Sequence, residues 1–340
     1  MILYIGNILS SKGLSPAPIE LIKDKICKSL GIKMITASDK KNKGLRFLHM
    51  NYVFWCNYRK VSLLFIDVYS TKAFYFALYF SIISKILSLK YIPIIHGGNI
   101  ESRIKKTRWL TNFIFKNADV NIAPSIFVFN IFKKNNYSIR YIPNCIDFSY
   151  YKFKIREKIR PRIFWLRAFH GIYNPEMAIY VLKDLCEFYS NASLTMVGAD
   201  KDGSLKKCKE ISKKYNLNHK VEFFGHLKKF EWIEKAKKHD IFINTSKIDN
   251  MPVSIIEIMA LGLPIISTNV GGIPFILENH KNSLLVRSND IKNMSLNIKY
   301  LIENHSIATT LSINALQDSK KFSIDLVIPE WVKIIKEYFD

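Results

Sequence analysis

The chain has 340 residues, of which 49% are hydrophobic and 23% are charged. This composition excludes a disordered tail, a collagen-like repeat and a small disulfide scaffold. Lysine and arginine number 51 against 28 acidic residues, and the formal net charge of +23 points to an anionic partner such as nucleic acid, acidic lipid or a phosphorylated small molecule.

The positive charge is unevenly distributed along the chain. Residues 1–155 carry 24 basic and 7 acidic side chains, whereas residues 156–340 carry 27 and 21. A compositional bias of the genome, the alternative explanation, would act on both halves alike, so the excess favours a binding surface in the first half. None of the 5 cysteines lies in a C-x-x-C pair, which indicates reduced thiols in a cytoplasmic protein and no metal site. The chain opens on MILYIGN without a cationic leader, so no signal peptide is predicted.

Short apolar, β-branched runs recur along the whole chain, each followed by a polar or glycine-rich loop, and amphipathic segments separate most of them. Apolar strands that alternate with helices are typical of parallel sheets covered on both faces, so the pattern predicts two doubly wound α/β domains in tandem. An apolar run at 73–84 is too short to span a bilayer and predicts a buried helix. The predicted strands are 2–6, 33–36, 63–68, 91–96, 120–123, 140–143, 162–166, 194–197, 221–224, 241–244, 264–267 and 283–286.

The boundary between the two domains is predicted in a charged stretch that ends at Pro161, before a fresh strand. Residues 1–155 would form the first Rossmann-like domain and residues 156–325 the second. The segment 326–340 is expected to be a helix that crosses back to the first domain. In such sheets ligands bind beyond the carboxyl ends of the strands, so we expect the domains to face a central cleft and the loops after the strands to carry the site.

Two loops of the first half contain glycines that let a ligand approach the backbone closely. The loop from Gly6 to Gly13 has neither the dinucleotide-binding nor the P-loop spacing, and a plain strand–helix turn explains it equally well. His96 directly follows a predicted strand and precedes Gly97 and Gly98. Such a histidine can meet a ligand, and a histidine satisfied inside the structure is the equal alternative.

In the second half, Arg167 directly follows a predicted strand, with His170 in the same loop. The planar guanidinium group of an arginine placed there can clamp a phosphate. An arginine paired with a nearby carboxylate is the equal alternative.

The loop and helix after the tenth predicted strand are the most informative segment. Asp249 and Glu257 are eight residues apart, and Pro252 and Ser254 suit the first turn of a helix. Asp249 then lies in the loop and Glu257 about one turn inside the helix, whose N-terminal amides favour an anion. Two acids beside an anion site suit a ligand that carries both hydroxyls and a diphosphate, and a nucleotide sugar carries both.

This half of the chain resembles the retaining glycosyltransferases of family 4, which have the GT-B fold. The hallmark of that family is two acids separated by seven residues, then a small-Gly-x-Pro turn and a Gly-Gly-hydrophobic-Pro loop; here these read DNMPVSIIE, ALGLP and VGGIP. The likeness extends to VGAD, FFGHL and IPNCID, so it covers most of the chain. It implies two Rossmann-like domains and the transfer of a sugar from a nucleoside diphosphate sugar with retention of configuration.

The resemblance implies a role for individual residues. Glu257 would bind the ribose hydroxyls, and Asp249 would contact the donor sugar. Arg167 would neutralise the diphosphate, and His96 would lie near the reacting carbon. The other implied donor contacts are Gly13, which would let the phosphates approach, Phe224 and Gly225 at the nucleobase, and Met251, Pro252, Val253 and Ser254 at the diphosphate or sugar.

The chain departs from the family at two positions. Asp249 stands where the family usually has a glutamate and is one methylene shorter, which alters the contact with the sugar. The family also tends to carry a lysine shortly after the arginine, whereas this loop reads RAFHGIYNPEM, so His170 or another cation would have to help neutralise the diphosphate. No cofactor and no metal ion are expected beside the donor, a UDP- or GDP-linked sugar.

The basic first half would hold the acceptor or a membrane contact. From Lys40 to Lys60, cations mix with Phe, Trp and Tyr, a pattern that suits a helix on anionic lipid headgroups; a solvated helix with an aromatic core side is the equal alternative. We expect a saccharide or lipid-linked saccharide acceptor in cell-surface glycan synthesis, no nucleic acid partner, and a cytoplasmic protein peripheral on the inner face of the membrane. The rival functions are a nucleotide-sugar epimerase or phosphorylase of the same fold and a non-catalytic basic binding module.

Overall fold

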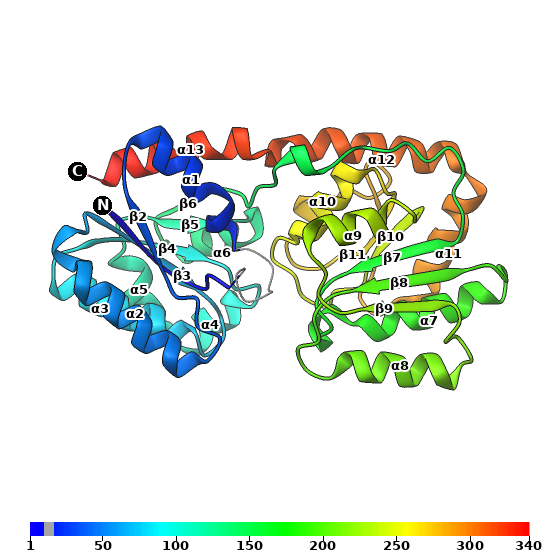
Figure 1. The fold of residues 1–340 in the computed structure, drawn as a ribbon, viewed down its shortest axis with the longest axis horizontal. Coiled ribbons are helices and arrows are strands. Elements are labelled where there is room, and N and C mark those ends of the chain that lie inside the picture. The colour runs from blue at the N-terminus through cyan, green and yellow to red at the C-terminus, as the bar shows by residue number, and fades with distance from the viewer. Residues whose placement is uncertain (10–16, 340) are drawn as a thin grey trace. The chain divides into compact units, whose positions relative to one another are not determined.

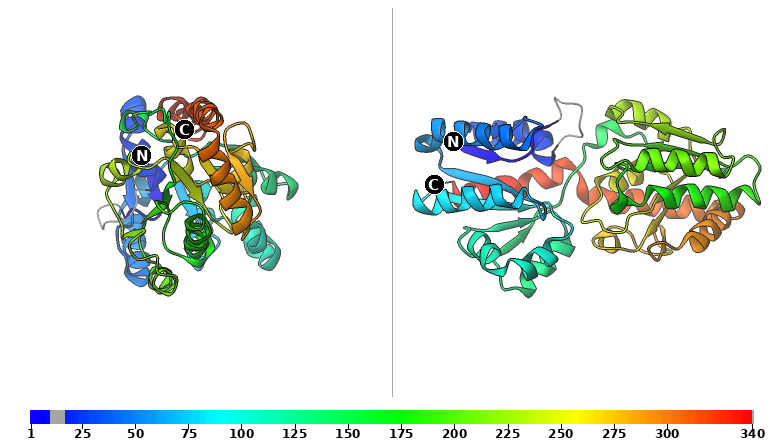
Figure 2. Two further views of the ribbon diagram at one scale, coloured as in Figure 1. Left: turned by 90° about the vertical axis from the view of Figure 1, so that its right-hand side faces the viewer. Right: turned by 90° about the horizontal axis from the view of Figure 1, so that it is seen from below.

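The computed structural model describes residues 1–9 and 17–339. The chain forms two compact units, one made of Met1–Cys145 with Ile324–Asp340 and the other of Ile146–Ser323. Each unit has a six-stranded parallel sheet between two layers of helices (Figure 1; Figure 2). All twelve predicted strands are present, so the prediction of two doubly wound α/β domains is confirmed.

The sheet of the first unit has the strand order β2-β1-β3-β4-β5-β6. The direction of the chain across this sheet reverses at β1, which lies between β2 and β3, and every neighbouring pair is parallel. Its strands are β1 (Ile2–Ile5), β2 (Met34–Ala37), β3 (Leu63–Val68), β4 (Lys90–Ile95), β5 (Asn121–Ala123) and β6 (Ile139–Tyr141).

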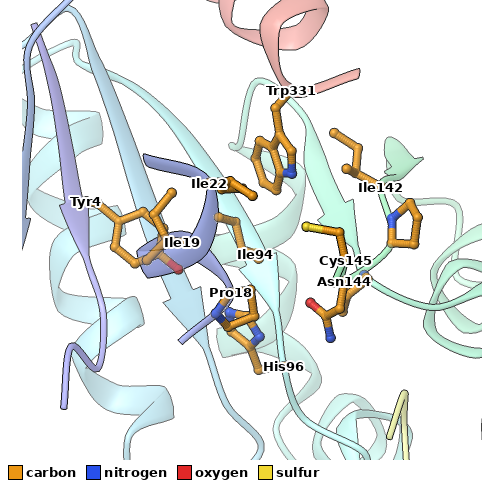
Figure 3. Close-up of a pocket in the computed structure, with 12 residues that line it drawn as sticks. Tyr4, Pro18, Ile19, Ile22, Ile94, His96, Ile142, Asn144, Cys145 and Trp331 are labelled. Atoms are coloured by element: carbon orange, nitrogen blue, oxygen red, sulfur yellow. The ribbon is translucent and has the colours of Figure 1, made fainter. Parts of the chain in front are cut away.

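Helices from the two ends of the chain cover one face of this first sheet. They are α1 (Pro18–Leu30) and α13 (Ile324–Tyr338), and both pack into one apolar cluster with alternate residues of β1, β3 and β4. In Figure 3, Trp331 of α13 lies near Ile22 of α1 and Ile94 of β4. The other face is covered by α2 (Lys43–Asn57), α3 (Phe74–Ile86), α4 (Ile100–Lys106), α5 (Arg108–Lys116) and α6 (Ile126–Lys134).

The sheet of the second unit has the order β12-β11-β10-β7-β8-β9. The chain direction reverses at β7, so β7 and β10 are neighbours and their carboxyl ends form the switch point where ligands bind in such folds. The strands are β7 (Arg162–Leu166), β8 (Ser193–Val197), β9 (Val221–Phe224), β10 (Ile241–Asn244), β11 (Ile265–Thr268) and β12 (Leu284–Val286).

Helices also cover both faces of the second sheet. One face carries α7 (Pro175–Cys186), α8 (Ser204–Lys214) and α11 (Ile291–Glu303), and the other carries α9 (Lys229–Ala236) and α10 (Val253–Leu261). The long helix α12 (His305–Ser319) contributes Ala308 and Leu311 to the apolar cluster beneath α7, α8 and α11. It contributes Ala315 to the apolar cluster beneath α9 and α10.

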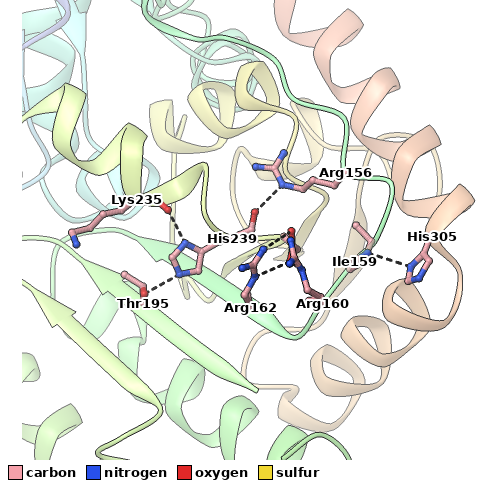
Figure 4. Close-up of polar contacts among 9 residues, drawn as sticks. Arg156, Ile159, Arg160, Arg162, Thr195, Lys235, His239 and His305 are labelled. Carbon is pink, nitrogen blue, oxygen red and sulfur yellow. Dashed lines mark hydrogen bonds and ion pairs between the residues drawn. The ribbon is translucent and has the colours of Figure 1, made fainter. Parts of the chain in front are cut away.

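The division between the units falls after Cys145, earlier than the predicted boundary at 155/156. The charged segment that suggested a linker is held on the second unit by buried Arg156, which donates to the backbone carbonyl oxygens of His239 at 2.8 Å and Gly262 at 2.8 Å (Figure 4). At the end of this segment, Arg160 and Arg162 both donate to Asp240 at 3.0 Å. These arginines therefore bind the segment to the second unit, although a run of charged residues in a sequence is also typical of a solvent-exposed linker.

The prediction of a buried helix at 73–84 is only half right. Helix α3 buries Phe74, Ala77 and Phe80 but exposes Ile82 and Ile86. An all-round apolar sequence fits a helix whose outer side meets something other than water. In residues 1–9 and 17–339, no helix combines the length and the hydropathy needed to cross a membrane.

Candidate active site

Arg167 and Asp249 lie together at the carboxyl edge of the second sheet, where β7 and β10 end side by side. Arg167 donates from Nη2 to Asp249 Oδ2, which also accepts from the Ser246 hydroxyl at 3.3 Å. The backbone N–H of Asn250 donates to Oδ1 at 3.0 Å. From the sequence, Arg167 could bind a phosphate or form an ion pair with a nearby carboxylate. In the structure it forms an ion pair with Asp249.

The Arg167 guanidinium keeps donors available beyond this ion pair. It stacks over the ring of Tyr173, with 4.2 Å from its central carbon to the ring centroid. Its Nε is buried and has no hydrogen-bond partner among the described residues. Because a guanidinium has five N–H donors, one contact with Asp249 leaves others for an anion.

Burial, partly offset by the charge of Arg167, raises the pKa of the Asp249 carboxyl. A buried ion is costly to desolvate, and the cation and hydrogen bonds beside Asp249 recover only part of that cost. A further hydroxyl or other hydrogen-bond donor beside Asp249 would therefore stabilise the charged form of its carboxyl group.

Helix α10 begins three residues after Asn250 with an uncapped N-terminus. Pro252 is its N-cap and provides no side-chain hydrogen bond. The first amides of a helix have no acceptor within the helix, so those of Val253 and Ser254 can meet an anion. The Ser254 hydroxyl is also buried and has no partner among the described residues. Met251, buried just before the helix, packs into the apolar cluster beneath it.

Glu257 lies about one turn inside α10, and only 9% of it is exposed. Its Oε1 accepts from the Tyr151 hydroxyl at 2.6 Å and lies 3.3 Å from Lys229 Nζ. Burial, opposed most strongly by the charge of Lys229, raises the pKa of the Glu257 carboxyl. Both contacts use the same oxygen, which leaves Oε2 to accept from other donors.

Gly271 and Gly272 of the VGGIP loop pack closely against the backbone of the site. A Cβ at Gly271 would overlap the carbonyl oxygen of Asp249, and one at Gly272 would overlap that of Asn250. The Gly272 N–H donates to the Asp249 carbonyl at 2.9 Å. These glycines let their loop pack against the Asp249–Asn250 backbone, so they help to position the acid.

Phe224 and Gly225 end β9 at the same edge of the sheet. The N–H of Gly198 donates to the carbonyl oxygens of Phe224 at 3.1 Å and of Gly225 at 3.2 Å, and the Arg167 N–H donates to Val197 at 3.2 Å. The space beside Gly225 is open, because a Cβ there would meet nothing within 4 Å. Lys235 Nζ lies 3.6 Å from the centroid of the Phe224 ring.

His96 belongs to the first unit, where it follows β4. Its Nε2 lies 2.7 Å from Asp67 Oδ1, and its ring stacks on Tyr69 with 5.3 Å between centroids. Buried Asp67 also accepts from the Tyr4 hydroxyl, and from the Asn7 amide at 3.3 Å. The contact of Nε2 with Asp67 therefore fixes the orientation of the His96 ring, and Nδ1 is the nitrogen of that ring on the other side from Asp67.

His96 also lines a pocket of about 360 Å³, part of which is open to solvent. In Figure 3 the apolar side chains of Ile19, Ile94 and Trp331 border this pocket, with His96 and Asn144 at its polar end. The pocket lies wholly within the first unit.

The structure thus brings most predicted donor contacts into one region of the second unit. Arg167 and Asp249 touch, and Met251 to Ser254 join that acid to the helix that carries Glu257. Predicted Gly13 lies outside the described residues. His170 Nδ1 accepts from the Ile172 N–H at 3.2 Å and lies 3.7 Å from Asp202.

Three residues that contact predicted site residues were missed by sequence reasoning. Tyr151 lies in the charged stretch predicted as the domain boundary, and Lys229 begins the helix after β9, among the loops that follow the strands. Asp67 is an acid in the otherwise apolar strand LLFIDV, a signal that could have drawn attention to it. Lys229 is the cation that the structure places beside Glu257.

The triplet Asp200-Lys201-Asp202 follows β8 at this edge, and its carboxylates cap turns. Asp200 accepts from the Gly203 N–H at 3.0 Å, and Asp202 accepts from the Gly171 N–H at 2.8 Å and the Ser204 N–H at 3.1 Å. Within the described part of the chain, no three His, Cys, Asp or Glu residues gather as a metal site would require.

Comparison with known proteins identifies the unit that holds this region. Residues 152–318 match the family model of the glycosyl transferases group 1. The resemblance to glycosyltransferases predicted from the sequence is confirmed over these residues, and retention of configuration stays a prediction. The match covers nearly all of the unit that contains Arg167, Asp249 and Glu257.

Curated glycosyltransferases are similar to part of this chain. An uncharacterized glycosyltransferase of Methanocaldococcus jannaschii is 28% identical over 173 residues, 51% of this chain and 48% of its own length. The N,N'-diacetylbacillosaminyl-diphospho-undecaprenol alpha-1,3-N-acetylgalactosaminyltransferase of Campylobacter jejuni is 26% identical over 102 residues, 30% of this chain and 27% of its own. The chain therefore spans about half, or less, of the length of these curated relatives.

A solved structure matches this chain over nearly its full length. Anabaena HepE, crystallised in complex with UDP and glucose, has a TM-score of 0.79 and 16% identity, with 99% of each chain covered. The GT-B fold predicted from the sequence, with two Rossmann-like domains, is thereby confirmed.

Proposed function

We propose that this glycosyltransferase transfers a sugar from a nucleoside diphosphate sugar, UDP- or GDP-linked, to an acceptor hydroxyl with retention of configuration and without a metal ion. In this proposal the second unit binds the donor and the first presents the acceptor. The observation that carries the proposal is the contact of Arg167 with Asp249 beside the uncapped N-terminus of α10.

The chemistry follows from the charge that the reaction develops. As the bond to the anomeric carbon breaks, negative charge grows on the departing diphosphate. The Arg167 guanidinium, fixed over Tyr173, and the amides of Val253 and Ser254 provide positive charge at one place. Groups that are already oriented need no rearrangement during the reaction, so they can stabilise the leaving group without a cation from solution.

The two acids would bind the hydroxyl groups of the donor. Glu257, with one carboxylate oxygen occupied by Tyr151 and Lys229, offers the other to the ribose hydroxyls. Asp249 would contact the sugar, and Phe224 and Gly225 would border the nucleobase. His96, oriented by Asp67, would meet the reacting end of the donor or acceptor from the first unit.

The acceptor would be a saccharide or a lipid-linked saccharide in cell-surface glycan synthesis. The name of the Campylobacter relative describes an acceptor linked to diphospho-undecaprenol, which supports this class. The complex of HepE with UDP and glucose supports a UDP-linked donor. A cytoplasmic protein that contacts the inner face of the membrane through the segment from Lys40 to Lys60 fits an acceptor of this kind.

A screen of nucleotide sugars by thermal shift, followed by product analysis with the best binder, tests the proposal. We expect a stabilising UDP- or GDP-sugar and, with a suitable acceptor, free nucleoside diphosphate plus a glycosylated product of unchanged anomeric configuration. An epimerised donor without transfer would identify the rival activity. Transfer that requires a divalent cation, or that inverts the anomeric carbon, would contradict the proposed mechanism.

A further inference from the structure

Helices α2 and α3 expose apolar side chains on the side that faces away from their sheet. On α2 these are Leu45, Leu48, Tyr52 and Trp55, and on α3 they are Ile82 and Ile86; together we name them the α2–α3 surface. Leu48 is 64% exposed, Tyr52 69% and Ile86 74%. The spacing on α2 repeats every three or four residues, which places the four side chains along one side of the helix.

The opposite sides of both helices are already occupied by the core. Met50 and Phe54 of α2 and Phe80 of α3 are buried against the sheet. The two helices contact each other through Phe47 and Phe76, whose ring centroids are 5.4 Å apart. The helices are thus adjacent and firmly packed, and the α2–α3 surface is additional to what the fold needs. Large apolar side chains exposed along two packed helices are a feature of interaction sites.

The charge around this surface is mainly positive. From residue 40 to residue 100 the sequence contains nine lysines and arginines and a single acid, Asp67, which is buried against His96. Lys41, Lys43 and Arg59 are exposed at the two ends of α2. Asp39, the acid just before this stretch, lies 3.8 Å from His49 of α2 and is paired with Lys40 at 3.3 Å. An exposed apolar strip bordered by an excess of cations is complementary to an anionic lipid surface.

The structure also corrects which residues of the Lys40–Lys60 segment can meet lipid. Arg46 is buried and donates to the Asn7 side chain at 2.7 Å and to the Lys40 carbonyl at 2.8 Å. It fixes the start of α2 to the first unit and is not part of the outer side. The apolar side chains therefore carry the contact as much as the cations do.

We propose that the α2–α3 surface docks the protein on an anionic lipid bilayer. Leu48, Tyr52, Trp55 and the isoleucines of α3 enter the boundary between headgroups and acyl chains, while the cations at the ends of α2 contact the phosphates. This deepens the proposed function, because a lipid-linked acceptor lies in such a membrane, yet lipid binding needs neither donor nor transfer.

Flotation of the full chain with phosphatidylcholine vesicles that contain phosphatidylglycerol tests this docking. We expect binding at low salt, weaker binding at high salt and little binding to phosphatidylcholine alone. Leu48→Glu with Trp55→Glu should abolish binding, and Lys43→Gln with Lys60→Gln should weaken it about fivefold for each lost cation. Brominated lipid should quench the fluorescence of the wild-type protein more than that of Trp55→Phe.

A matched control comes from the second unit, where Phe188 is 63% and Leu296 50% exposed. Phe188→Glu with Leu296→Glu should bind vesicles like the wild type, and all variants should keep the wild-type melting temperature and donor binding. Absence of binding, equal binding to neutral vesicles, or a Leu48→Glu, Trp55→Glu variant that still binds would overturn the proposal. A concentration-dependent dimer that this variant disrupts would overturn it too, because the surface would then join two copies of the chain.

Discussion

The ion pair of Arg167 and Asp249 gives each residue a partner before any donor arrives, so its removal has two separable effects. Arg167→Ala should lower kcat by about 10²–10³, because a positioned cation is lost from the leaving diphosphate. It should weaken binding of the nucleoside diphosphate more than that of the nucleoside alone. Steady-state kinetics and calorimetric titration of both ligands measure these effects.

The same substitution also leaves a buried carboxylate without its cation. The double variant Arg167→Ala, Asp249→Asn removes that unpaired charge. If the guanidinium acts on the diphosphate, the double variant stays as slow as the single one. Recovery of kcat in the double variant would instead show that Arg167 only neutralises Asp249.

The raised pKa of Glu257 predicts the pH dependence of donor binding. Because burial raises this pKa above its ordinary value of 4.5, the acid takes up a proton earlier as the pH falls, and a neutral carboxyl accepts fewer hydroxyl hydrogen bonds. Donor affinity should therefore decline on an acid limb that lies above the ordinary range. Titrations across acid and neutral pH should show this limb in the wild type and not in Glu257→Gln.

For stability the sign is opposite to that for binding. A folded-state pKa above the unfolded one means that the folded protein holds the proton more tightly. The contributions of Glu257 and Asp249 are therefore largest at low pH and are lost as the pH rises through their raised pKa values. Tyr151→Phe keeps the acid and removes one donor, so it should retain the acid limb of donor binding.

At the scale of an element, the loop after β11 acts on the acid through its glycines. Gly272→Ala should move the Asp249–Asn250 backbone, because the new Cβ would overlap the Asn250 carbonyl. We expect lower stability and a loss of donor affinity together. Gly171→Ala is the matched control, since its Cβ would meet only Asp202 at 3.6 Å. Thermal denaturation and donor titration of both variants would detect the difference, and wild-type affinity in Gly272→Ala would refute this role.

These elements show why the sequence predicted the fold better than the site. Each apolar strand, such as β3 or β10, corresponds to a short run of consecutive apolar residues, so all twelve strands could be recognised from the sequence. The contacts of Glu257 with Tyr151 and Lys229 join positions that are far apart in the chain, and no local pattern encodes them. The sequence of α3 likewise shows that the helix is apolar all round but not which of its sides the sheet covers.

At the scale of the whole molecule, α13 stabilises the first unit although it follows the second in the sequence. Trp331 packs on Phe65 of β3 with 5.7 Å between ring centroids. Trp331→Ala should cost about 3–5 kcal/mol and reduce hydrogen-exchange protection of β1 to β6. The equally buried Trp232 is the matched control in the second unit, where Trp232→Ala should affect β7 to β12. Loss of protection spread evenly over both sheets in either variant would contradict this separation.

The late position of α13 has a consequence for synthesis on the ribosome. The second unit, Ile146–Ser323, is made entirely before α13 emerges, which at ~5–20 residues per second takes on the order of ten to forty seconds. During that interval Ile2, Leu63 and Phe65 lack one of the two helices that cover them. The domain that starts first is therefore completed last. A nascent chain that stalls in the second domain carries a sheet face that α1 covers without α13, and chaperones can recognise the apolar part that is left exposed.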